Sequence, residues 1–111
     1  TPDTIGLFNK ENFGKMKSTA YFFNTTRGAV VNQDDLVEAL STGVIAGAGL
    51  DVTTPEPLPT DHPLFSLPNC VVLPHICSAT FETRDAITNL GMDNLHAALS
   101  GTDMPHQVKP Q

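Results

Sequence analysis

The stretch Val44–Val52 (VIAGAGLDV) constrains the fold more than any other part of the chain. It is almost continuously apolar and rich in glycine. A strand with one solvated face alternates apolar and polar residues, whereas a strand of a parallel sheet is covered on both faces and forms an unbroken apolar run. The stretch therefore predicts a buried strand with parallel neighbours, which requires long crossover connections.

Apolar runs and helical patterns alternate along the rest of the chain. Two further runs have the composition of strands, and three segments have the spacing or the capping residues of helices. We expect strands at 19–26 and 70–76, and helices at 9–17, from the cap Asn32 to Gly43, and from about Thr80 to Ser100. A proline-rich loop precedes the last strand, and long loops of this kind usually have a function. This order predicts an α/β fold with a parallel sheet and helical crossovers.

The composition limits the class of function. The 111 residues are enough for one small domain with one core. The net charge is −6 and Lys and Arg are not clustered, so nucleic-acid binding is not expected. No apolar run could span a bilayer, and the first ten residues lack a signal pattern, so we expect neither membrane insertion nor secretion. Two cysteines without a disulfide framework suit free thiols and a cytoplasmic location.

Polar and charged residues follow each predicted strand. In open parallel sheets, ligands bind at the carboxyl ends of the strands, where the loops meet. This rule places four side chains near one crevice: Arg27, Asp51, Glu56 and His75.

Each of these residues also has a simpler interpretation. Arg27 could be a surface guanidinium paired with an acid, or a two-point clamp for a carboxylate. Glu56 could be a solvated loop residue and His75 a structural one, or together they could form a carboxylate–imidazole pair. A nucleophilic pair of Cys77 with His75 lacks an evident third member and oxyanion hole. The histidines and cysteines do not match a zinc spacing, so no metal is expected.

Three motifs together resemble the D-2-hydroxyacid dehydrogenase family. They are NTTRG (24–28), GLDVTTPEP (49–57) and LPHICSAT (73–80). The stretch 55–64 (PEPLPTDHPL) is most similar to the glyoxylate reductase/hydroxypyruvate reductase branch. The resemblance implies a Rossmann-type fold, with 1–80 as the C-terminal half of the NAD(P)-binding domain and 81–111 as a crossing helix and tail that belong to the substrate domain.

The resemblance also implies the chemistry. It is hydride transfer from NADPH or NADH to a small 2-keto acid, such as glyoxylate or hydroxypyruvate. By comparison with the family motifs, Arg27 holds the substrate carboxylate, His75 is the acid–base and Glu56 is its partner. The chain would be the C-terminal third of an enzyme without its glycine-rich phosphate loop. We therefore expect the chain alone to be inactive and to expose a strand edge and apolar surface.

Further site positions are implied by the same comparison. Thr25, Asp51 and Cys77 are assigned to the cofactor site, and Ser78 joins the substrate-binding residues. The family usually has glycine at the position of Cys77 and an aliphatic residue at that of Thr25. A side chain at position 77 could crowd the nicotinamide or the substrate.

Other functions fit the same resemblance. The chain could belong to another D-2-hydroxyacid dehydrogenase, of the phosphoglycerate or D-lactate type. It could also belong to a dinucleotide-sensing transcriptional co-repressor, because that group shares the fold and the three catalytic-type residues. A homodimer is expected for the full-length protein in the enzymatic cases.

Overall fold

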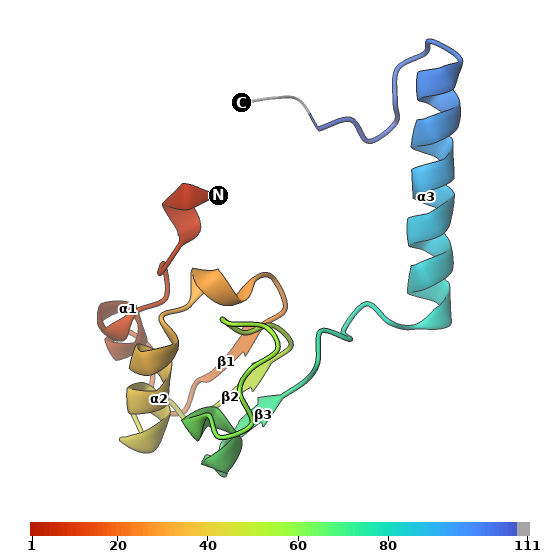
Figure 1. Cartoon of the computed structure of the whole chain (residues 1–111). Helices are drawn as coiled ribbons and strands as arrows, with labels where there is room; N and C mark the ends of the chain where they lie inside the picture. The colour runs from red at the N-terminus through yellow and green to blue at the C-terminus, as the bar shows by residue number, and fades with distance from the viewer. Residues whose placement is uncertain (109–111) are drawn as a thin grey trace. The chain divides into compact units, whose positions relative to one another are not determined.

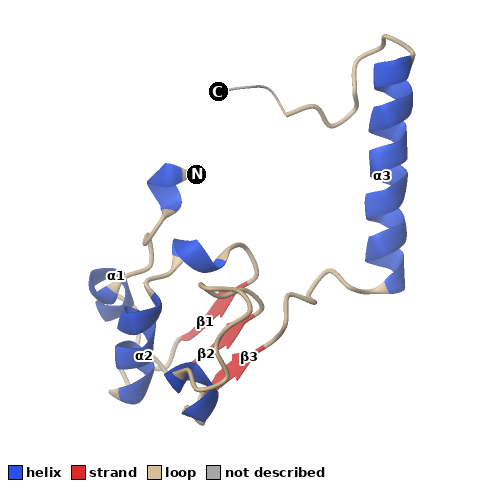
Figure 2. Ribbon diagram, viewed as in Figure 1, coloured by secondary structure: helices blue, strands red, loops and turns tan. Residues whose placement is uncertain are grey.

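The structure is a computed structural model that describes residues 1–108 (Figure 1). The chain divides into two compact units, Thr1–Ile76 and Cys77–Gln111. The first unit contains a three-stranded sheet in the order β1-β2-β3, which Figure 2 shows in red. The strands are β1 (Tyr21–Asn24), β2 (Gly47–Leu50) and β3 (Cys70–Val72). Both strand pairs are parallel, so the predicted α/β fold with a parallel sheet is confirmed.

Each strand is shorter than its apolar run predicted. Before β2, Gly43 has a φ of 72° and the amide of Val44 donates to the carbonyl of Ala39, so these residues close the preceding helix. Ile45 is apolar because it is fully buried in the core rather than because it extends the strand. After β3, Pro74 has no N–H to donate, which prevents a regular continuation of the ladder.

Two helices of the first unit begin after asparagine caps, of which Asn32 was predicted as a cap and Asn9 was not. Helix α1 (Lys10–Gly14) starts after Asn9, whose side chain accepts from the amide of Asn12, and it ends three residues before the predicted end. Helix α2 (Gln33–Ser41) starts after Asn32, whose side chain accepts from the amide of Asp35. Helix α2 connects β1 to β2. The connection from β2 to β3 is the expected long loop, but it contains an unpredicted 3₁₀ turn, η3 (Pro63–Ser66).

One face of the sheet carries the core of the first unit. The strand register places Phe22, Ala48 and Cys70 side by side on this face. Helices α1 and α2 supply the fully buried Phe13 and Leu36, which belong to the same apolar cluster. The ring of Phe22 meets that of Phe13 edge to face at 5.4 Å between centroids. Packing on this face therefore holds β1 and β2 against helices α1 and α2. The carboxyl ends of the strands lie at the edge of this packed layer.

The opposite face of the sheet is open in this unit. Tyr21, Phe23 and Val71 are 65%, 72% and 60% exposed. The two rings lie over the glycines of β2, since a Cβ on Gly47 or Gly49 would stand 2.9 Å and 2.8 Å from ring atoms of Tyr21 and Phe23. The expected exposure of apolar surface is confirmed. Strand β2 itself is covered on both faces, as its apolar run predicted: its residues are buried except for Gly49, which is partly buried.

The second unit is built on helix α3 (Phe81–Leu99). Its predicted bounds are nearly right: Thr80 caps it by accepting from the amide of Thr83, and Gly101 follows with a φ of 68°. Most of its large apolar side chains are exposed, Phe81 and Leu99 most of all. Among the residues that the structure describes, no helix is long and apolar enough to cross a membrane.

Candidate active site

The loop after β1 is shaped by a buried asparagine. The side-chain oxygen of Asn24 accepts from the amide and the hydroxyl of Thr26, at 3.0 and 2.8 Å. Its amide group donates to the carbonyl of Arg27 at 3.0 Å. These bonds close a tight turn in which Thr25 is exposed. The sequence indicated this stretch but not the role of Asn24, although an asparagine at the end of a strand is a turn signal.

Arg27 emerges from this turn with an exposed side chain. Its Nη1 donates to the carbonyl of Thr26 at 2.8 Å. Within residues 1–108 it forms no ion pair, so the alternative of a surface salt bridge does not describe it. Arg27 lines a cavity of about 760 Å³ near Ile5 and Val30, which is a different cavity from the one beside Glu56. Its role as a carboxylate clamp stays a prediction.

The structure brings the predicted acid–base residue and its partner together. His75 Nδ1 lies 2.6 Å from Glu56 Oε1. Both side chains remain partly open to solvent. A carboxylate accepts hydrogen bonds, so the proton of this bond belongs to Nδ1, and Nε2 is the nitrogen left to face a reacting group.

A buried aspartate holds the turn that carries His75. Asp51 is 3% exposed. Its carbonyl accepts from the amide of His75 at 2.9 Å, and its Oδ1 accepts from the amide of Ile76 at 2.7 Å. His75 has a φ of 55°, in the left-handed region that costs a histidine energy unless its surroundings impose it. The sequence indicated Asp51 as a site residue but not this contact with the backbone.

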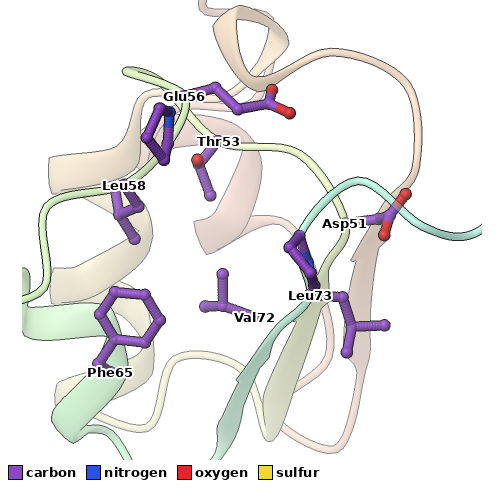
Figure 3. A pocket seen from close by; sticks show the side chains of 9 residues that line it. Asp51, Thr53, Glu56, Leu58, Phe65, Val72 and Leu73 are labelled. Atoms are coloured by element: carbon purple, nitrogen blue, oxygen red, sulfur yellow. The ribbon is translucent and has the colours of Figure 1, made fainter.

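A pocket lies between the loop after β2 and the end of β3. Its volume is about 510 Å³. Figure 3 shows its apolar walls and the carboxylates of Asp51 and Glu56 near its margin. It is lined by Asp51, Thr53, Glu56, Pro57, Leu58, Phe65, Val72, Leu73 and Pro74. An apolar cavity with a few polar groups at its edge suits a largely uncharged ring rather than an anionic group.

The cysteines occupy different environments. Cys70 lies on β3, and burial raises the pKa of its thiol. Cys77 is exposed and begins the second unit, together with Ser78. Neither cysteine forms a disulfide, as the composition predicted. The contacts of Arg27, Asp51 and the pair of Glu56 with His75 all lie within the first unit.

A parallel α/β sheet with polar residues gathered at the carboxyl ends of its strands is typical of dinucleotide-binding domains. The comparisons with known proteins agree. The family model described as "D-isomer specific 2-hydroxyacid dehydrogenase, NAD binding domain" matches residues 1–77. The chain belongs to this family, and the resemblance seen in its motifs is confirmed.

Several of the similar proteins are reductases of the predicted branch. The glyoxylate reductase/hydroxypyruvate reductase of Mus musculus is 60% identical over 98% of the chain and 33% of its own length. That of Homo sapiens is 61% identical over the same shares. A solved NADPH-dependent glyoxylate/hydroxypyruvate reductase from Sinorhizobium meliloti, in complex with NADP and malonate, has a TM-score of 0.87 at 38% identity, over 97% of this chain and 34% of its own. The chain thus spans about a third of the length of these relatives.

Proposed function

We propose that this chain is the catalytic C-terminal part of an NAD(P)H-dependent reductase of glyoxylate and hydroxypyruvate. The observation that carries the proposal is the contact between His75 and Glu56 at the carboxyl end of β3. This pair is a source of one proton, held where ligands of parallel sheets bind. The similarity to reductases of these two keto acids supports the substrate class.

His75 supplies the proton of the reaction. When bound, the reduced nicotinamide cofactor provides the hydride that goes to the carbonyl carbon. The oxygen then gains negative charge, and Nε2–H of the imidazolium donates its proton to it, giving the alcohol. Glu56 accepts from Nδ1 throughout, which orients the ring and stabilises its positive charge. In the reverse direction, neutral His75 accepts the proton at Nε2.

The other site residues bind and orient. Arg27 is assigned to the carboxylate of the keto acid, because a guanidinium can hold two oxygens at once and align the carbonyl group. The apolar pocket beside Glu56 suits the nicotinamide ring of the cofactor, NADP or NAD, which is uncharged in the reduced form. Thr25, Asp51 and Cys77 are assigned to that end, and Ser78 to the substrate.

The domain organisation belongs to the same proposal. Residues 1–80 are assigned to the C-terminal half of the NAD(P)-binding domain. Residues 81–111 are assigned to a crossing helix and tail of the substrate domain, of which 109–111 lie outside the described residues. The family match over 1–77 and the division of the chain after Ile76 support this boundary. We further propose a homodimeric enzyme in the cytoplasm.

The test uses the complete enzyme, meaning this chain joined to the remaining two thirds of a reductase, either its own or that of the mouse relative. Reductase activity is measured with NADPH and NADH against glyoxylate, hydroxypyruvate, pyruvate and phosphohydroxypyruvate. We expect turnover of the first two and none by the chain alone. A folded complete enzyme that binds cofactor but reduces none of them would contradict the proposal and favour a dinucleotide sensor.

A further inference from the structure

The side chain of Gln33 binds both backbone groups of one distant residue. Gln33 is the first residue of α2, and Thr54 lies 21 positions further along the chain. The amide of Thr54 donates to Gln33 Oε1 at 2.7 Å, and Gln33 Nε2 donates to the carbonyl of Thr54 at 2.6 Å. One side chain thus replaces the two hydrogen bonds that a neighbouring strand would make.

Helix α2 does not need this side chain for its own start. The side chain of Asn32 already accepts from the amide of Asp35. An amide group that satisfies both backbone groups of a loop residue acts on the loop rather than on the helix. The effect of Gln33 is therefore on the loop around Thr54.

The loop leads directly to Glu56. Thr53 is buried, and its hydroxyl donates to the carbonyl of Pro55 at 2.9 Å. The backbone of Gly28 also packs against Thr53. A Cβ atom on Gly28 would stand 1.9 Å from the carbonyl oxygen of Thr53. Two residues after Thr54, Glu56 reaches His75 Nδ1.

We propose that Gln33 is a positioning residue for proton transfer, acting through Thr54 on Glu56 and hence on His75. This inference rests on the proposed function. Gln33 contacts neither member of the pair, but it fixes the backbone from which the carboxylate extends. Loss of this contact lets the carboxylate move relative to the imidazole, and small displacements of catalytic groups lower the rate of the chemical step.

The first experiment compares Gln33→Ala with Asp34→Asn, a matched control on the exposed neighbouring residue of the same helical turn. In the complete enzyme, Gln33→Ala should lower kcat on the order of tenfold, with little change in KM for the keto acid. The control should leave both unchanged. In a Glu56→Gln background, Gln33→Ala should cause almost no further loss, because the two changes act on the same contact. A full additional loss there would overturn the proposal.

A second variant makes the contact depend on pH. In Gln33→Glu the ionised carboxylate still accepts from the amide of Thr54, but it faces the carbonyl of Thr54 with no proton to donate. A protonated glutamic acid restores that donor. The kcat of Gln33→Glu relative to Gln33→Ala should therefore rise as the pH is lowered, and a ratio that does not change with pH would overturn the proposal.

A readout without activity separates this inference from the proposed function. Pro55 and Pro57 have no amide hydrogen, so exchange in the segment 53–57 reports mainly on Thr53, Thr54 and Glu56. Exchange should accelerate in Gln33→Ala and not in Asp34→Asn. Unchanged exchange would overturn the inference even if the enzyme is active. A complete enzyme without turnover would refute the proposed function, while exchange would still test whether Gln33 holds the loop.

Discussion

The proposed acid–base pair, His75 and Glu56, and Arg27, the proposed carboxylate clamp, lie at strand ends of the same sheet, but the chain holds them differently. The pair is braced on both sides: Asp51 binds the backbone around His75, and Gln33 binds the backbone near Glu56. The turn before Arg27 is held by Asn24, but the guanidinium is exposed, and its hydrogen bond within residues 1–108 is to the neighbouring carbonyl of Thr26. The difference teaches that the proposed proton-transfer pair is held in place by residues of this chain, whereas the described residues give the proposed carboxylate clamp no comparable brace.

The largest effect should come from removing the proton donor. In the complete enzyme, His75→Asn should lower kcat by about two to four orders of magnitude, the usual contribution of general acid–base catalysis. Asparagine tolerates the left-handed backbone of this residue better than most side chains, so the turn should survive. Kinetics with hydroxypyruvate, together with a cofactor-binding measurement, check this. Activity within a few fold of the wild type would exclude His75 as the acid–base.

A smaller effect is expected from a change at Arg27, the proposed carboxylate clamp. Arg27→Lys keeps the charge but loses the two-point geometry, so kcat/KM for keto acids should fall roughly tenfold to a hundredfold. Cofactor binding should hardly change. Steady-state kinetics with varied keto acid and a separate cofactor titration measure the two quantities. Unchanged kinetics with every small keto acid would remove Arg27 from the site and leave the acid–base pair as its only assigned catalytic group.

The smallest effect concerns the packing of β3, the strand that leads to His75. Because burial raises the pKa of the Cys70 thiol, less of it is thiolate at a given pH than in an unfolded chain. Alkylation at Cys70 should therefore be slower in the folded complete enzyme than in the unfolded protein at the same pH, and its rate should still rise with pH where the rate of the unfolded protein has levelled off. Mass spectrometry of the labelled peptide follows the reaction, with urea-unfolded protein as the control. Equal rates in both states would show that β3 is not packed as described.

Local signals in the sequence predicted much of the fold. The caps Asn32 and Thr80 act within three residues of their own positions, and both helices begin where these residues indicated. The predicted strands were too long, because a buried residue outside the strand, such as Ile45, is as apolar as a strand residue. Apolar composition alone does not distinguish the two.

The finer features of the site required the structure. The bond of Gln33 to Thr54 joins residues 21 positions apart, and no periodic pattern marks it. The left-handed backbone of His75 is imposed by Asp51, from a different strand end, and a histidine does not signal such a conformation by itself. The rule on carboxyl ends of strands did select Glu56 and His75, because it depends only on the order of the strands.

The most direct test of the central claim is a double-mutant cycle of Glu56→Gln and His75→Asn in the complete enzyme. Glutamine keeps an oxygen that can accept from Nδ1 but removes the negative charge that stabilises protonated His75. In the otherwise unchanged enzyme, Glu56→Gln should lower the kcat of reduction on the order of tenfold. In a His75→Asn background the same change should cause almost no further loss, because the two side chains act as one unit. If Glu56→Gln lowers kcat equally in both backgrounds, or not at all, while the variants bind cofactor normally, Glu56 does not act on His75 and the proposed acid–base pair is wrong.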